Sequence, residues 1–355
     1  MVWISGITSI PWVYWVSQLL FISASGKRPS RCHRHRLFFI HTELAKTPRT
    51  DAMLKILTLM LLVTFPATAT TYKVYYLGGQ SNMEGFGENV DLPANYRAPL
   101  KSVPVFQGNP VADFKPGGGL GLWDTLQPGF GRQFYSDGKT NQHSDYFGPE
   151  LSFGHQIAKL HPGQNVALIK YALGGSALGY GVGNNWYPDY RRGNGINQYD
   201  NFLTTIRKAV ATRDIDGDGE PDTLVPAGII WMQGESDAYD SEITANRYLE
   251  NLKTMMALFR AALRNPDLPV VLGKITDSGL DPEDGLRMNW GSLVQQAQLD
   301  FVEQDSCAAL VTVTESFTHL DDGWHYTSAD YLTLGRQFAE RVAQLESQCA
   351  TRSSE

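Results

Sequence analysis

A serine directly after a predicted strand is the first residue in the sequence that could act as a nucleophile. Ser81 follows Gly78 and Gly79 and precedes Asn82. Glycines let the chain turn sharply, so that a hydroxyl and its own backbone N–H can face one substrate. Such a serine can act as a nucleophile where a base reaches it. A serine after two glycines is also common in ordinary turns.

A histidine near the end of the chain is the candidate base. His325 closes the segment Asp321-Asp322-Gly323-Trp324-His325, between the last predicted strand and the last predicted helix. Asp322 can reach the imidazole from a tight turn, where it would set the tautomer and stabilise the imidazolium. Asp321 is the alternative partner, and the alternative role for His325 is a structural histidine at the start of a helix. The pattern therefore predicts a Ser81–His325–Asp322 triad.

Acyl transfer also needs hydrogen-bond donors for the oxyanion. The sequence offers the backbone N–H groups of Ser81 and of Gly174 or Gly175, and the side-chain amide of Gln233 or Asn82. Losing one such donor typically costs about 3 kcal/mol of transition-state stabilisation. We expect Ser81, Gly174, Gly175 and Gln233 to form the oxyanion hole.

The elements that must position these residues alternate between short apolar strands and longer helices. Strands are predicted at 72–77, 166–171, 227–232, 270–275 and 310–313, and helices at 150–160, 201–212, 243–265, 290–303 and 328–345. This alternation favours a five-stranded parallel sheet in a three-layer α/β/α sandwich. Ligands bind beyond the carboxyl ends of such strands, where the candidate residues lie.

Two long segments, 84–147 and 178–200, are rich in glycine and polar residues and have little periodicity. Ordered loops of this length usually build a binding surface. Seven of their aromatic residues could stack on sugar rings, although we expect more than half simply to pack the loops: Trp123, Phe130, Phe134, Tyr180, Trp186, Tyr187 and Tyr190.

An acidic segment resembles a calcium-binding loop. Asp214, Asp216, Asp218 and Asp222 fit the pattern D-x-D-x-D-G-x-x-D, and carboxylates at alternate positions suit a hard cation. Position twelve of an EF-hand loop would be Val225 instead of glutamate, so the EF-hand is incomplete. A structural calcium ion and a solvated acidic turn are both open interpretations, and neither has a part in catalysis.

The N-terminal segment differs from the rest of the chain in charge. Residues 1–69 carry eight Lys/Arg and two Asp/Glu, although the whole chain has a net charge of −7. Residues 53–69 resemble a signal peptide ending in Ala-Thr-Ala, which makes 1–52 a misassigned start outside the mature protein. The alternative is a membrane anchor at 10–23, which is short for a span. A metal site at Cys32, His33 and His35 lacks a fourth ligand.

The remaining chain is predicted to be one domain, 70–348, followed by a short tail, 349–355. Its two cysteines, Cys307 and Cys349, could form one disulfide in an exported protein or remain free thiols. A weakly acidic chain lacks the basic face that nucleic-acid binding requires. We expect no stable membrane span in the mature protein and a secreted or periplasmic location.

Three sequence blocks resemble the sialate O-acetylesterase-like family of SGNH hydrolases. They are 79–83 (GQSNM), 231–237 (WMQGESD) and 322–325 (DGWH), the last followed by Leu334-Gly335. The resemblance spans roughly 72–345. It implies an α/β/α sandwich, a triad of Ser81, His325 and Asp322, and no obligate cofactor. Broader SGNH enzymes carry an asparagine in the block where Gln233-Gly234-Glu235 stands here.

The resemblance also implies an activity. We expect a serine esterase that removes O-acetyl groups from a carbohydrate, either an acetylated hemicellulose or acetylated sialic acid. Gln80, Asn82 and Glu235 are predicted to bind substrate, with bracing of the nucleophile loop as the alternative for Glu235. The alternative functions are a non-catalytic carbohydrate-binding protein on the same fold and an SGNH lipase or thioesterase.

Overall fold

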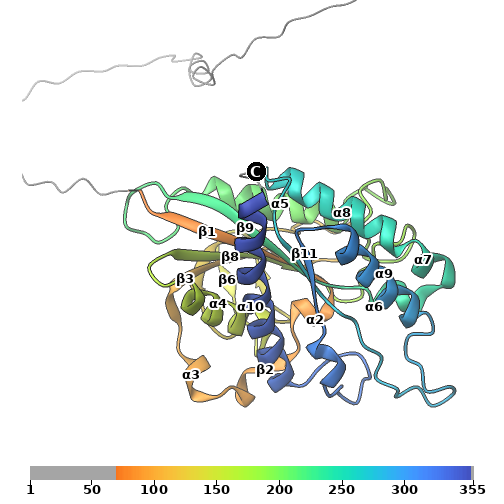
Figure 1. The fold of residues 1–355 in the computed structure, drawn as a ribbon. Coiled ribbons are helices and arrows are strands. Elements are labelled where there is room, and N and C mark those ends of the chain that lie inside the picture. Colours follow the sequence, from red (N-terminus) through yellow and green to blue (C-terminus); the bar gives the residue numbers. More distant parts are fainter. Residues whose placement is uncertain (1–68, 353–355) are drawn as a thin grey trace, which may run out of the picture. The chain divides into compact units, whose positions relative to one another are not determined.

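The computed structural model describes residues 69–352 (Figure 1). The Cys32/His33/His35 run and, except for its last residue, the predicted signal peptide lie outside the described residues. No helix within 69–352 combines the length and the apolar character that crossing a membrane would need.

A seven-stranded sheet forms the centre of the molecule, in the order β11-β10-β9-β1-β8-β3-β4. Its strands are β1 (Thr71–Gly79), β3 (Leu100–Gln107), β4 (Trp123–Leu126), β8 (Asn165–Ala172), β9 (Thr223–Met232), β10 (Val270–Gly273) and β11 (Ala308–Val311). All pairings are parallel except that of β3 with β4. The five predicted strands are confirmed, and among themselves they have the flavodoxin-like order 2-1-3-4-5.

The predicted number of strands was too small, because β3 and β4 lie in the segment that reads as a loop. Pro104 lies within β3, and the register of the pairing of β3 with β4 shifts between Leu100 and Pro104. Proline lacks the N–H that a strand donates, so it weakens the strand pattern. β4 is only four residues long and sits at the sheet edge.

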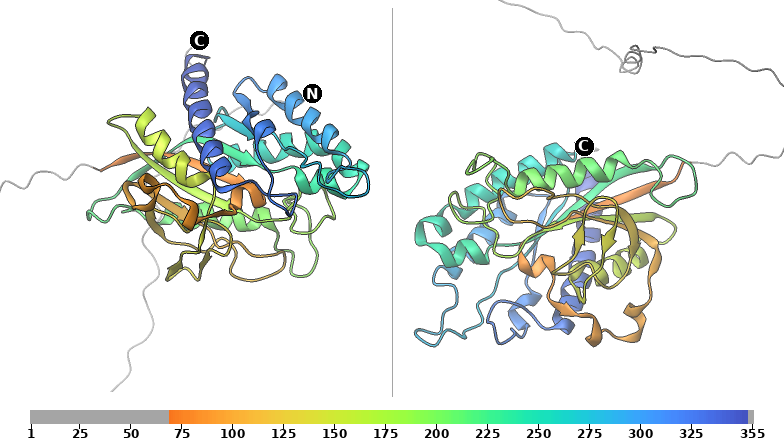
Figure 2. Two further views of the ribbon diagram at one scale, coloured as in Figure 1. Left: turned by 90° about the horizontal axis from the view of Figure 1, so that it is seen from below. Right: turned by 180° about the vertical axis from the view of Figure 1, so that it is seen from behind.

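Successive side chains of β1 point alternately into the two helical layers, as a three-layer sandwich requires. The Tyr75 ring packs against Phe153 on one face, whereas the Tyr76 ring packs against Phe202 and Phe259 on the other. The first face carries α4 (Pro149–Leu160) and α10 (Ser328–Arg352), and the second carries α5 (Gln198–Ala211), α8 (Tyr248–Ala262) and α9 (Gly291–Gln304) (Figures 1 and 2). The three-layer fold class is confirmed.

Two predicted helices differ from the observed ones. The helix expected at 243–265 is divided at Arg247 into α7 (Glu242–Asn246) and α8, and α6 (Glu235–Asp240) precedes them. The last helix continues past its predicted end through Arg352, into the expected tail. The short elements are α2 (Ser81–Glu84), β2 (Gly87–Glu88), η1 (Asn89–Asp91), α3 (Ala94–Arg97), β5 (Tyr135–Ser136), β6 (Asn141–Gln142), β7 (Tyr146–Phe147) and η2 (Val313–Ser316).

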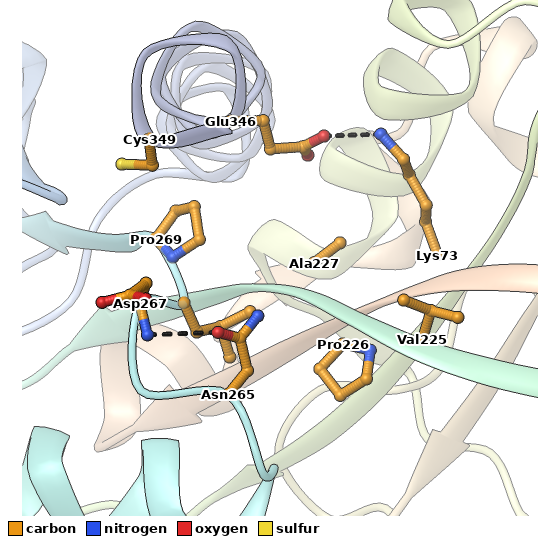
Figure 3. A pocket seen from close by; sticks show the side chains of 10 residues that line it. Lys73, Val225, Pro226, Ala227, Asn265, Asp267, Pro269, Glu346 and Cys349 are labelled. Atoms are coloured by element: carbon orange, nitrogen blue, oxygen red, sulfur yellow. Dashed lines mark hydrogen bonds and ion pairs between the residues drawn. The ribbon is translucent and has the colours of Figure 1, made fainter. Parts of the chain in front are cut away.

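The C-terminal end of α10 is fixed to the amino-terminal edge of the sheet. A disulfide joins Cys349 to Cys307, which directly precedes β11. Glu346 forms an ion pair with Lys73 of β1, with an N–O distance of 2.7 Å (Figure 3). Glu346 also accepts a hydrogen bond from Tyr75. One covalent bond and one partly buried carboxylate therefore anchor this helix.

Removing the disulfide should destabilise the fold, because the bridge closes a loop of 42 residues and so restricts the unfolded chain. The double variant C307S/C349S should lose about 2–4 kcal/mol of unfolding free energy, measured by urea denaturation. Wild-type protein unfolded in dithiothreitol should match the variant. An unchanged urea midpoint in the variant would show that the bridge adds no stability.

Candidate active site

The loop after β1 places Ser81 at the carboxyl edge of the sheet. Gly79 has a φ of +146°, and a Cβ added there would lie 1.9 Å from the carbonyl oxygen of Met232. Only glycine lets β1 and β9 end this close together. The backbone N–H of Gln80 then donates to that same carbonyl at 2.9 Å. Ser81 follows as the first residue of α2.

A buried ion pair between Lys170 and Glu150 holds the α2 turn in place. Lys170 on β8 donates to the carbonyl oxygen of Glu84 at 2.9 Å and to that of Phe130 at 2.7 Å. Its third bond goes to the Glu150 carboxylate at 2.6 Å, and both side chains are almost completely buried. A buried charge that makes all its bonds holds its partners in one arrangement. The α2 turn is therefore tied to β8 and to the neighbouring long loop.

The candidate base sits in a tight turn before α10. His325 Nδ1 lies 2.6 Å from an oxygen of Asp322. The other Asp322 oxygen accepts the backbone N–H groups of Trp324 and His325, at 2.8 and 3.1 Å. Gly323 adopts a φ of +72° within the turn. The expected pairing of Asp322 with His325 is present, and it leaves Nε2 of the imidazole for a substrate or nucleophile.

The pKa values of this pair fit a neutral imidazole beside an ionised carboxylate. Burial lowers the pKa of His325 below its ordinary value, although the Asp322 hydrogen bond opposes the shift. Burial would raise the pKa of Asp322, but the hydrogen bonds from His325 and Trp324 outweigh it and lower the value. A histidine that is neutral near pH 7 can accept a proton.

The imidazole is also held by an aromatic ring that the sequence did not single out. Phe86 stacks on His325 with a centroid distance of 3.5 Å and an interplanar angle of 8°. The Arg132 guanidinium lies 4.6 Å from the Phe86 centroid and 4.6 Å from that of Tyr146. These contacts restrict the orientation of the His325 ring.

Ser81 and His325 line the same pocket, which has a volume of about 500 Å³. It lies where the loops after β1, β8 and β9 meet the turn before α10. The topology therefore brings together the two residues that lie at opposite ends of the sequence. The other lining residues are Gln80, Phe86, Gly174, Gly175, Val182, Ser236, Tyr239, Asp240 and Trp324.

Two of the predicted oxyanion donors are engaged elsewhere. The N–H of Gly174 donates to the Glu84 carboxylate at 2.7 Å. The Gln233 side chain is fully buried, and its amide donates to Asp237 at 2.7 Å. The sequence predicts that both donors face the acyl group, but in the structure each is bound to a buried carboxylate instead. Buried carboxylates take these N–H groups because an unpaired buried charge is costly.

Gln80, which the sequence predicts to bind substrate, offers a side-chain donor that was not among the expected oxyanion donors. Its side-chain oxygen accepts from the backbone N–H groups of Gly234 at 3.3 Å and Ser236 at 3.2 Å, and from the Gln233 amide at 3.3 Å. These donors fix the orientation of the carboxamide, so Nε2 remains as its donor. Gln80 lines the pocket together with Ser81 and Gly175.

Asn82 and Glu235, predicted to bind substrate, are buried beside the pocket and do not line it. Asn82 donates to Glu235 at 2.7 Å and to the Trp324 carbonyl at 3.0 Å, and it accepts from the Tyr331 hydroxyl at 2.7 Å. Burial raises the pKa of Glu235 to about 7. The bracing role considered for Glu235 fits this geometry.

Most of the loop aromatics pack the loops, as expected. Phe130, Phe134, Trp186 and Tyr190 are buried, and Tyr180 is 62% exposed. Of the seven proposed stacking residues, including the partly buried Trp123 and Tyr187, none lines the pocket. The aromatic residues that line it are Phe86, Tyr239 and Trp324.

The acidic loop lies between α5 and β9, at the end of the sheet opposite the pocket. Carboxylate oxygens of Asp214, Asp216 and Asp218 lie within 4.8 Å of one another. Asp222 is not part of this group of carboxylates, and it accepts the N–H of Ile215 at 2.7 Å. Three of the four predicted ligands therefore converge, and their all-oxygen donor set suits calcium.

A family model of carbohydrate esterases, described as sialic acid-specific acetylesterases, matches residues 71–344. No curated protein sequence matches the chain. Among solved structures, a protein from Arabidopsis thaliana has 19% identity and a TM-score of 0.52, covering 78% of this chain and 99% of that one. NanS has 17% identity and a TM-score of 0.51, covering 79% and 99%. At such identities these structures show the fold alone.

A carbohydrate acetylesterase from Xanthomonas citri has 18% identity and a TM-score of 0.50, covering 79% of this chain and 57% of its own. The solved relatives share this fold, in which a mostly parallel sheet lies between two helical layers. The family model spans most of the chain, so this protein belongs to the carbohydrate esterase family of sialic acid-specific acetylesterases.

Proposed function

We propose that the protein is a serine esterase that removes O-acetyl groups from a carbohydrate through an acetyl-enzyme. The observation that carries the proposal is the shared pocket: Ser81 and His325 both line it, while Asp322 binds the far nitrogen of the imidazole. A hydroxyl, a neutral base and an ionised orienting carboxylate are the parts that acyl transfer requires.

In the proposed mechanism, His325 Nε2 takes the proton of the Ser81 hydroxyl as the oxygen attacks the acetyl carbonyl. Asp322 stabilises the imidazolium that forms. The imidazolium then gives its proton to the leaving sugar oxygen as the ester bond breaks. Water, deprotonated by the same imidazole, cleaves the acetyl-enzyme to acetate and regenerates the serine hydroxyl.

The oxyanion would be held by the backbone N–H groups of Ser81 and Gly175 and by Nε2 of Gln80. All three residues line the pocket, and the orientation of the Gln80 carboxamide is fixed before substrate arrives. Donors that need not reorganise stabilise a developing charge most effectively. This set replaces the Gln233 amide and the Gly174 N–H suggested by the sequence.

A small acyl group suits the space beside the nucleophile. A Cβ added to Gly174 would lie 3.3 Å from the Cβ of Ser81, so the absence of a side chain there leaves room next to the attacking oxygen.

A secreted or periplasmic location is part of the proposal, and the Cys307–Cys349 disulfide supports it because such bridges persist in oxidising compartments. No part for nucleic acid is proposed.

Replacing Ser81 tests the proposal directly. The Ser81→Ala variant should lower kcat for p-nitrophenyl acetate by at least about a thousandfold, because the covalent route is lost. Ser236→Ala is the matched control, since Ser236 lines the same pocket, and it should keep most of the activity. Equal rates for wild type and Ser81→Ala would remove Ser81 from the mechanism.

The same assay separates the alternative functions. A non-catalytic carbohydrate-binding protein would bind glycans without releasing acetate. A lipase or thioesterase would prefer long acyl chains in a series of p-nitrophenyl esters, whereas the proposal requires acetate to be the best substrate.

The pH profile should report His325. Activity falls on the acidic side as the imidazole becomes protonated, and burial places that fall below the pH of an ordinary histidine. The positive charge of Arg132 also lowers the pKa of His325. Arg132→Gln should therefore raise this pKa and move the acidic limb of kcat/KM to higher pH, whereas Arg132→Lys should leave it in place. A limb that stays fixed in Arg132→Gln would contradict the assignment.

A structural calcium ion at the acidic loop is a separate proposal, supported by the converging carboxylates of Asp214, Asp216 and Asp218. Bound there, the ion would clamp the loop between α5 and β9 and reduce the repulsion among its charges. Calcium chloride should then raise the melting temperature by about 2–4 °C relative to EDTA, and Asp218→Asn should abolish the difference. Identical melting curves in calcium and EDTA would dismiss the site.

A further inference from the structure

The pocket lining carries an acidic side chain but, among the described residues, no basic lysine or arginine. Asp240 contributes the carboxylate. The other ionisable side chains of the lining are those of Tyr239 and of His325, which the proposed mechanism requires to be neutral. A substrate carboxylate would therefore meet a like charge in the lining itself, while the positive charge of Arg132 lies outside the lining, over the Phe86 ring.

The Asp240 carboxylate is held in place by neighbouring hydroxyl groups. Thr244 donates to its Oδ2 at 2.6 Å and Ser241 donates to the same oxygen at 3.0 Å. Both contacts use one carboxylate oxygen, so the other keeps its capacity to accept hydrogen bonds from a ligand. A carboxylate fixed in this way can accept hydrogen bonds from sugar hydroxyls.

Two aromatic rings stand beside this carboxylate. Tyr239 directly precedes Asp240, is 60% exposed and lines the pocket. Its ring lies 5.3 Å from that of Trp324, at 81°. An exposed aromatic surface can cover the C–H face of a sugar while a nearby acceptor binds its hydroxyls. Because Trp324 precedes His325, such a sugar would lie close to the reacting atoms.

Two arginines lie against aromatic residues of the lining, and each also contacts another residue. The Arg132 guanidinium lies over the rings of Phe86 and Tyr146, at 4.6 Å from each. Arg287 lies 5.7 Å from the Trp324 ring, and it pairs with the Asp281 carboxylate at 3.7 Å. Neither arginine lines the pocket. Asp240 is therefore the carboxylate that lines the pocket, while the positive charge of Arg132 acts on His325 from outside the lining.

We propose that this pocket selects an uncharged acetylated sugar, with Tyr239 and Trp324 covering its ring and Asp240 binding its hydroxyls and repelling anionic sugars. The substrate class would then be a neutral glycan of the acetylated hemicellulose type instead of acetylated sialic acid. This inference rests on the proposed esterase function.

The test compares kcat/KM for acetylated xylo-oligosaccharides with kcat/KM for O-acetylated N-acetylneuraminic acid, using the purified protein. Wild type should prefer the neutral substrate. Asp240→Asn keeps the shape and the acceptor oxygen but removes the charge, so it should raise the anionic-to-neutral ratio by about three- to tenfold. Glu242→Gln, the same charge change at an exposed residue outside the pocket, should leave that ratio unchanged.

A salt series on wild type gives a second measurement that needs no variant. Raising the ionic strength screens Asp240 and should increase the ratio for wild type but not for Asp240→Asn. A wild-type preference for the sialic acid ester would overturn the inference, as would an Asp240→Asn ratio equal to that of Glu242→Gln. Hydrolysis of p-nitrophenyl acetate is measured in parallel for wild type and Ser81→Ala. If this hydrolysis did not depend on Ser81, the esterase proposal itself would be refuted, whereas the ratios above test only the choice of substrate.

Discussion

The buried side chain of Asn82 joins the three segments that must meet for this site to exist. Its amide donates to Glu235 on α6 and to the carbonyl oxygen of Trp324, and its own oxygen accepts the hydroxyl of Tyr331 on α10. Asn82 directly follows Ser81, and Trp324 directly precedes His325. One amide thus sets the distance between the segment of the nucleophile and the segment of the base. Because an unpaired polar group at this depth would be costly, all three contacts form together.

Buried carboxylates shape the rest of the site by attracting backbone donors. Glu84 holds the N–H of Gly174, and Asp237 holds those of Leu178 and Gly179. Burial raises the pKa of Asp237 to about 6, although these N–H bonds oppose the shift. The long loop after β8 is therefore anchored to α2 and α6 before it reaches the surface. The Gly174 N–H and the Gln233 amide, which the sequence offers as oxyanion donors, bind buried carboxylates and so hold the scaffold together. The donors left for substrate are those that no buried carboxylate binds.

The sequence predicts well where a pattern has one physical cause. The five strands were found because buried parallel strands must be almost continuously apolar, and His325 was placed because the turn before the last helix lies at the same sheet edge as Ser81. The proline in β3 and the shortness of β4 hid two further strands. Phe86 and Asp240 could not have been singled out, because their roles depend on which loop residues meet in space. The use of Gln233 could not be foreseen either, since only the fold shows that Asp237 lies within its reach.

The position of His325 is finally a matter of how α10 is fixed as a rigid body. Thr327 and Asp330 cap the start of this helix with a 2.6 Å hydrogen bond between their side chains, directly after the histidine turn. In the first half of the helix, a Cβ on Gly335 would lie 2.1 Å from the carbonyl oxygen of Pro149, so glycine allows α10 to approach α4 closely. At its far end, Cys349 and Glu346 anchor the helix to the opposite edge of the sheet. These three contacts hold α10 in one position along its axis. The position of the His325 imidazole, directly before the helix, is therefore fixed relative to β1 and Ser81.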